Sequence, residues 1–138
     1  MLATELHFSW GFHVFMNLKI LSWNVRGLND CRKHSIVKNL LREWKCDVIC
    51  LQETKLNGMD RQMVGNFWSC PFVDWVALDA VQTVGGVLMM WDRRVLERTE
   101  VLVSSFSVSV RWQGVGEDFS WVCSGVYSPI DNNVRGLM

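Results

Sequence analysis

The chain has 138 residues, 49% of them hydrophobic, which is typical of one folded domain and excludes a disordered segment. Fourteen basic residues balance fourteen acidic ones, which argues against a protein that coats nucleic acid through excess positive charge. The five cysteines form neither a disulfide framework nor a Cys-x-x-Cys zinc motif, so reduced thiols in the nucleus or cytoplasm, not secretion, are expected.

Residues 1–17 differ from the rest of the chain and are interpreted as an N-terminal extension. The stretch His7–Met16 is apolar and aromatic, but it has no basic start and no cleavage site of the kind a secretory signal needs. It is also too short to span a membrane, so no membrane partner is expected. We expect either a loosely packed leader or an added edge strand.

Two apolar runs, Leu18–Asn24 and Asp47–Glu53, predict strands on either side of a helix. Strand, helix and strand within this length are typical of one βαβ unit, whose strands are parallel. Parallel strands end at the same edge of a sheet, so Asn24 and Glu53 should converge there, where sites of open α/β sheets form. An oxygen-rich pair of this kind suits a hard cation such as Mg²⁺.

The connecting segment from Asp30 to Lys45 has a clear helical pattern. Asp30 can cap the first free amides, and apolar residues recur at helical spacing on one face: Ile36, Val37, Leu40, Leu41 and Trp44. Basic residues lie mostly off that face: Arg32, Lys33, Lys38, Arg42 and Lys45. They form either a phosphate-tracking patch or a solvated helix surface, and the neutral overall charge favours the second interpretation.

Downstream, the pattern predicts a loop near Asn57–Asp60, a short helix at 63–68 and a strand-rich remainder. Four strand-rich segments are expected: 73–79, 86–91, 101–110 and 119–127. A turn at 114–118 should make a hairpin of the last two. Gly85 and Gly86 are interpreted as relief of crowding where a strand begins. Cys46 and Cys50 are expected to share one buried face of their strand.

The amino-acid sequences of several segments resemble those of a known family. Ile20–Asn29 (ILSWNVRGLN) and Asp47–Lys55 (DVICLQETK) resemble the start of the endonuclease/exonuclease/phosphatase superfamily, which includes DNase I. The phrases SWNVRGLN and LQETKL look most like plant non-LTR (LINE-type) retrotransposon endonucleases, where Arg26 replaces an acidic residue of the abasic-site nucleases. Gly85–Trp91 and Gly125–Pro129 resemble later segments of the family in the expected order.

This resemblance implies an α/β fold, the four-layer α/β sandwich of DNase I-like proteins with a mixed sheet. The family's Gly-Asp-Phe-Asn and Ser-Asp-His segments are not found, so residues 18–138 are interpreted as the truncated N-terminal part of such a domain. We therefore expect an incomplete sandwich that lacks its second sheet. An uncovered apolar sheet face would then allow self-association.

The resemblance also implies a site. Glu53 and Asn24 would hold Mg²⁺, or Mn²⁺ in its place, though weakly in this fragment. Lys55 would not bind the ion itself but would orient the Glu53 carboxylate that does. Two interpretations of Tyr127 stay open: a catalytic phenol that points toward the phosphate, and a hydroxyl in the core.

The implied activity is that of a Mg²⁺-dependent phosphodiesterase, a DNA endonuclease of retroelement type, with DNA as partner of the complete domain. Without the downstream aspartate, asparagine and histidine, the chain is expected to be inactive alone. Two alternatives stay open: a phosphoinositide-type phosphatase of the same superfamily, and a non-catalytic interaction fragment.

Overall fold

The computed structural model describes residues 3–7, 11–15, 18–82, 84–118 and 120–126. These residues form nine strands and two helices. In chain order the elements are β1 (Ala3–His7), β2 (Gly11–Phe15), β3 (Leu18–Asn24), α1 (Cys31–Trp44), β4 (Val48–Gln52), α2 (Arg61–Phe67), β5 (Val73–Leu78), β6 (Val87–Asp92), β7 (Leu96–Val103), β8 (Ser107–Gly114) and β9 (Ser120–Val126).

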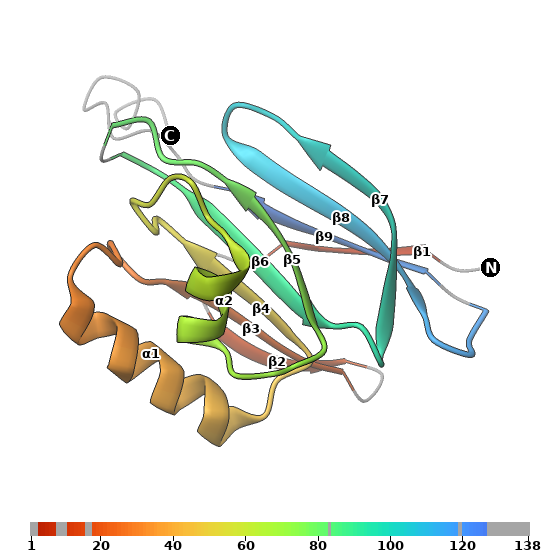
Figure 1. The fold of residues 1–138 in the computed structure, drawn as a ribbon. Coiled ribbons are helices and arrows are strands. Elements are labelled where there is room, and N and C mark those ends of the chain that lie inside the picture. Colours follow the sequence, from red (N-terminus) through yellow and green to blue (C-terminus); the bar gives the residue numbers. More distant parts are fainter. Residues whose placement is uncertain (1–2, 8–10, 16–17, 83, 119, 127–138) are drawn as a thin grey trace.

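The strands form two sheets that pack face to face. A five-stranded sheet has the order β2-β3-β4-β6-β5 and is mixed, since only β3 and β4 run parallel. A four-stranded sheet has the order β1-β9-β8-β7. Both helices cover the face of the five-stranded sheet that points away from the second sheet (Figure 1). The described residues therefore build three layers, namely helices, sheet and sheet.

Two apolar clusters hold these layers together. Between the sheets, Trp91 on β6 packs edge-on against Trp112 on β8, with ring centroids 5.4 Å apart. Between helices and sheet, Val37 and Leu41 of α1 pack with Phe67 of α2. All of β4 and β6 is buried because these central strands contribute side chains to both clusters, which explains why their sequences are continuous apolar runs.

The predicted α/β fold with a mixed sheet is confirmed, but the expected absence of a second sheet is wrong. Strands β7, β8 and β9 form that sheet by antiparallel pairing, and β1 adds to it in parallel. Gly125 lets the sheets approach closely, because a Cβ there would lie only 2.7 Å from the Cys50 sulfur.

The outer face of the second sheet is also not the apolar face that was expected. On β8 and β9 the inward positions carry Val, Trp and Cys, whereas the outward positions are mainly polar: Ser107, Ser109, Arg111, Gln113, Ser120 and Ser124. Apolar side chains on the described part of this face include Leu102, Val122 and Val126, and the first two line a shallow hollow with polar neighbours. Self-association through this outer face stays a prediction. Its mainly polar side chains do not form the apolar patch from which self-association was expected.

The predicted βαβ unit is confirmed in detail. Strands β3 and β4 are adjacent and parallel, with Asn24 opposite Gln52. Asp30 caps α1 by accepting from the backbone N–H of Arg32, and Lys45 ends the helix in the left-handed conformation. Of the expected apolar face, Val37 and Leu41 are buried, but Ile36 is 56% exposed because it lies at the margin of the contact with the sheet.

Two further expectations change, and for residues 1–17 the interpretation as an added edge strand is confirmed. Cys46 precedes β4 and packs with the helices, whereas Cys50 lies between the sheets, so the two cysteines do not share a face. The segment 101–110 is not one strand, because the chain turns between β7 and β8. Residues 1–17 supply one edge strand to each sheet, β1 and β2. No helix within the described ranges is long and apolar enough to cross a membrane.

Candidate active-site edge

The structure brings Asn24 and Glu53 to the same edge of the five-stranded sheet. Asn24 is the last residue of β3, and its register partner Gln52 directly precedes Glu53. Both side chains are half-buried. The Asn24 Oδ1 accepts from the backbone N–H of Arg26 at 3.1 Å, which fixes the amide and leaves the oxygen a second lone pair. The backbone of these two residues therefore lies at one edge of the sheet, and the convergence of their side chains stays a prediction.

Backbone hydrogen bonds hold the loops at this edge together. After β3, Gly27 donates to the Glu53 carbonyl at 2.7 Å, and Leu28 donates to the Thr54 carbonyl at 2.7 Å. From the other side, Lys55 donates to the Gly85 carbonyl at 2.8 Å. The segment carrying Glu53 therefore lies between two neighbouring loops and is bonded to both of them.

Several residues of this edge adopt backbone conformations that ordinary side chains avoid. Arg26, Glu53 and Lys55 all have positive φ, at 54°, 54° and 58°. Such residues cost about 1 kcal/mol or more each and persist only where the surroundings impose them, as at functional sites. Gly86 is needed for a different reason: with φ at 93°, a Cβ would collide with Thr54 Oγ1 and lie 3.2 Å from the Lys55 nitrogen.

Two side chains of α1 hold the loop that follows Asn24. The Lys33 ammonium donates to the carbonyls of Val25 at 3.2 Å and Arg26 at 3.1 Å. The His34 Nε2 makes a short hydrogen bond with the Leu28 carbonyl, and its ring packs edge-on against Phe67, centroids 4.8 Å apart. Lys33 is therefore not simply part of a solvated helix surface, as its sequence position suggested.

Lys55 lies beside the same loop. A Cβ placed on Gly27 would be 3.1 Å from Lys55 Cδ, so the aliphatic part of this lysine passes over Gly27. This contact keeps the lysine close to the loop between Asn24 and α1. It is compatible with the predicted supporting role of Lys55, which the structure does not test.

Tyr127 lies outside the described residues. Its predecessor Val126 ends β9, and the Val126 carbonyl accepts from the Gln52 Nε2 at 3.3 Å. Gln52 is 5% exposed and joins the end of β9 in the second sheet to the residue before Glu53. Sequence reasoning missed Gln52, Lys33 and His34 as parts of this edge. The polar Gln52 within an apolar strand was the one available signal.

The donor set at this edge fits a hard cation with few protein ligands. It offers the Glu53 carboxylate and the free lone pair of the Asn24 amide oxygen, which is the chemistry that Mg²⁺ selects. Among the described residues, no group of three His, Cys, Asp or Glu side chains could form a protein-only metal cage. The residues present therefore suit an ion that keeps most of its coordination for water and substrate oxygens.

Comparisons with known proteins agree with the fold. Residues 21–128 match the model of the Endonuclease/Exonuclease/phosphatase family, so the chain belongs to this family. The AP endonuclease LMAP from Leishmania major superposes with a TM-score of 0.62 at 18% identity, covering 80% of this chain and 40% of that one. The Xenopus laevis APE2 catalytic domain gives 0.59 at 16% identity, covering 83% and 46%.

These likenesses show a shared fold. The chain spans less than half the length of either solved structure. A search of curated proteins found no match.

Proposed function

We propose that this chain carries the metal-binding part of a Mg²⁺-dependent DNA endonuclease of retroelement type. The observation that supports the proposal is the shared edge of parallel β3 and β4, at which Asn24 and Glu53 follow in sequence inside the segment that matches the family model. One of the two structurally similar proteins, LMAP, is an AP endonuclease by name, which favours DNA as the substrate class. Arg26 and the sequence motif SWNVRGLN support an endonuclease of retroelement type.

In this proposal Glu53 holds Mg²⁺ through its carboxylate, and Asn24 completes the site through its amide oxygen, directly or through water. The ion, when bound, polarises the phosphodiester and stabilises the leaving oxygen. Lys55 orients Glu53 and tempers its charge, and the Tyr127 phenol contacts the phosphate. The positive-φ backbone at Arg26 and Glu53 positions these groups before substrate arrives.

We expect this chain to bind the metal ion with low affinity. One carboxylate and one amide seldom retain Mg²⁺ without phosphate oxygens, because the ion dehydrates reluctantly. Titration with Mg²⁺ or Mn²⁺, followed by amide shifts near Glu53, should show binding only at high concentration and none in Glu53→Gln. Tight binding that survives this substitution would place the site elsewhere and contradict the proposal.

We further propose that the 138-residue chain alone does not cleave DNA at a significant rate. Among the described residues, no group of three His, Cys, Asp or Glu side chains could hold a metal ion, and residues acting as one unit fail together when members are absent. A plasmid-nicking assay with Mg²⁺ tests this directly. Nicking that Glu53→Ala removes would overturn the claim of inactivity while supporting the assignment of Glu53.

A nuclear or cytoplasmic location is part of the same proposal. All five cysteines are free thiols, and three of them are buried. Burial raises the pKa of Cys46 and Cys123 to about 12, so both stay uncharged and unreactive in the folded protein. Fractionation of cells that express the tagged chain would test the location.

A further inference from the structure

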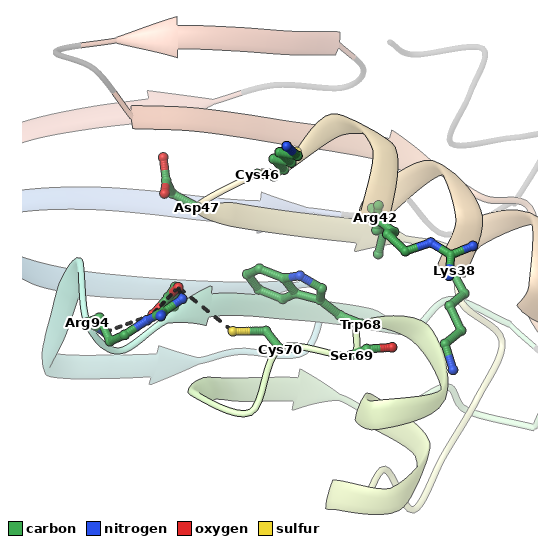
Figure 2. A pocket seen from close by; sticks show the side chains of 11 residues that line it. Lys38, Arg42, Cys46, Asp47, Trp68, Ser69, Cys70 and Arg94 are labelled. Atoms are coloured by element: carbon green, nitrogen blue, oxygen red, sulfur yellow. Dashed lines mark hydrogen bonds and ion pairs between the residues drawn. The ribbon is translucent and has the colours of Figure 1, made fainter.

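A second candidate site lies at the end of the five-stranded sheet opposite Asn24 and Glu53. There a pocket of about 380 Å³ opens where β4 begins and β6 ends. Asp47 and Asp92 mark this end, since the Asp92 backbone donates to the Asp47 carbonyl at 3.1 Å. The pocket is lined by the C-terminal half of α1, the segment from Trp68 to Cys70 and the turn after β6 (Figure 2). Its volume is that of a small-molecule site.

The charges in this pocket are unevenly matched. The α1 side carries Lys38, Arg42 and Lys45. Among the described residues, Lys38 and Lys45 make no ion pair or hydrogen bond through their side chains, and Arg42 donates only to the Asn39 amide oxygen. Three cations therefore face the pocket without a carboxylate partner of their own.

The two aspartates in the lining are already engaged. Asp92 is held by Arg94, with 2.7 Å between Nη2 and Oδ2, and this contact lowers the pKa of the Asp92 carboxyl. Asp47 Oδ2 accepts from the backbone N–H of Lys19 at 2.8 Å. Once Asp92 and Arg94 cancel, one carboxylate remains against three cations, so the pocket is net positive on a protein of zero net charge.

The helix terminus explains only part of this arrangement. Cations near a helix C-terminus are favoured by its partial negative charge, which accounts for Arg42 and Lys45 at the end of α1. That effect falls off within the last turn, and Lys38 lies more than one turn before Trp44. Lys38 therefore adds positive charge to the pocket that the helix itself does not require.

The rest of the lining is mixed and contains one aromatic side chain, with Leu41, Cys46, Trp68, Ser69 and Cys70. Trp68 and Leu41 line the pocket and are 8% and 1% exposed. Figure 2 shows the indole of Trp68 between Arg94 and Cys70 on one side and Arg42 on the other. A pocket with an aromatic wall and a cluster of cations matches a ligand that has both a ring and an anionic group.

We propose that this pocket binds a small phosphate monoester that carries a ring system, with its phosphate on Lys38, Arg42 and Lys45 and its ring against Trp68. Lysine and arginine are common phosphate ligands, lysine as a point charge and arginine as a fork. The site is separate from the Asn24–Glu53 edge and does not depend on metal or on nuclease activity there.

Amide shifts of the ¹⁵N-labelled full chain test the proposal, with AMP, adenosine and inorganic phosphate as probes. AMP should shift the amides of Lys45, Cys46, Ser69 and Cys70, and should bind roughly tenfold tighter than adenosine or phosphate. The double variant Lys38→Glu/Lys45→Glu should weaken AMP binding by about tenfold or more, because attraction becomes repulsion. Arg98→Glu, an exposed charge on β7, is the matched control and should bind as the wild type does.

Four outcomes would overturn the proposal. They are no binding of any probe at millimolar concentration, AMP binding that the double variant leaves unchanged, shifts centred on the loop around Glu53, and phosphate binding as tightly as AMP. If the double variant does not fold, Lys38→Gln alone replaces it, with a smaller loss expected. Glu53→Ala should leave AMP binding unchanged, so failure of the nuclease proposal and failure of this one are distinguishable.

Discussion

The two ends of the five-stranded sheet are built by different means. At the Asn24–Glu53 end, backbone hydrogen bonds between three loops hold Arg26, Glu53 and Lys55 at positive φ. At the opposite end, backbone bonds also join the chain, as from Asp92 to the Asp47 carbonyl, and the ion pair of Arg94 with Asp92 is added to them. The first end keeps residues in a costly positive-φ conformation, whereas at the second end a largely buried Asp92 carboxylate is paired with a more exposed Arg94. The two ends therefore differ in backbone conformation and in side-chain charge.

Gly86→Ala should be the most damaging change at the first end. The new Cβ would meet Thr54 and the Lys55 backbone at a positive φ, so we expect a loss of about 3 kcal/mol in the free energy of unfolding. Gly58→Ala is the matched control in the next loop, where φ is also positive but nothing lies within 4 Å. It should cost only about 1 kcal/mol. Urea denaturation measures both, and equal losses would contradict the steric argument.

Lys33→Met should loosen the loop after Asn24. It removes two hydrogen bonds from a charged donor, to Val25 and Arg26, with an expected cost of about 1 to 2 kcal/mol. In this variant, the backbone amides of Gly27 and Leu28 should exchange their hydrogens faster than in the wild type. Lys38→Met, on the same helix but without such bonds, should stay within about 0.5 kcal/mol of wild type. If the two variants behave alike, Lys33 does not position this loop.

Asp92→Asn tests the charged end through pH. Its hydrogen bond to Arg94 lowers the pKa of Asp92 below the ordinary 3.8, so the ion pair stabilises the fold above that value. The stabilisation is lost as pH falls through the lowered pKa of the folded state. We expect Asp92→Asn to cost about 1 kcal/mol at pH 7 and progressively less as pH falls through the lowered pKa of the folded state. Thermal unfolding across this range, with exposed Glu97→Gln as control, should show the difference shrinking only for Asp92.

The smallest effects on stability should come from placing glycine at residues that have a left-handed backbone conformation. Glu53→Gly should be more stable than Glu53→Ala by about 0.5 to 1 kcal/mol, because glycine adopts positive φ without strain. Lys45→Gly against Lys45→Ala, at the end of α1, should give a similar gain. Calorimetric unfolding can resolve such differences. A gain at Lys45 but none at Glu53 would mean that the site edge stores no strain.

Local sequence determined much of this protein. Two apolar runs and the helical periodicity between them defined β3, α1 and β4, and the parallel geometry of a βαβ unit brought Asn24 and Glu53 to one edge of the sheet. Asp30 as helix cap and Gly86 at the start of β6 followed from their chemistry. These features depend on residues near one another in sequence, and the pattern of a short segment contains that information.

Tertiary structure alone decided the remainder. The second sheet depends on pairing across the chain, and the bond from Gln52 to Val126 spans 74 positions in sequence. The opposite placement of Cys46 and Cys50, and the meeting of α1 with Trp68 and Asp92 around one pocket, depend equally on distant contacts. No periodicity within one segment specifies which distant strand lies beside it, because packing of the whole core selects that partner.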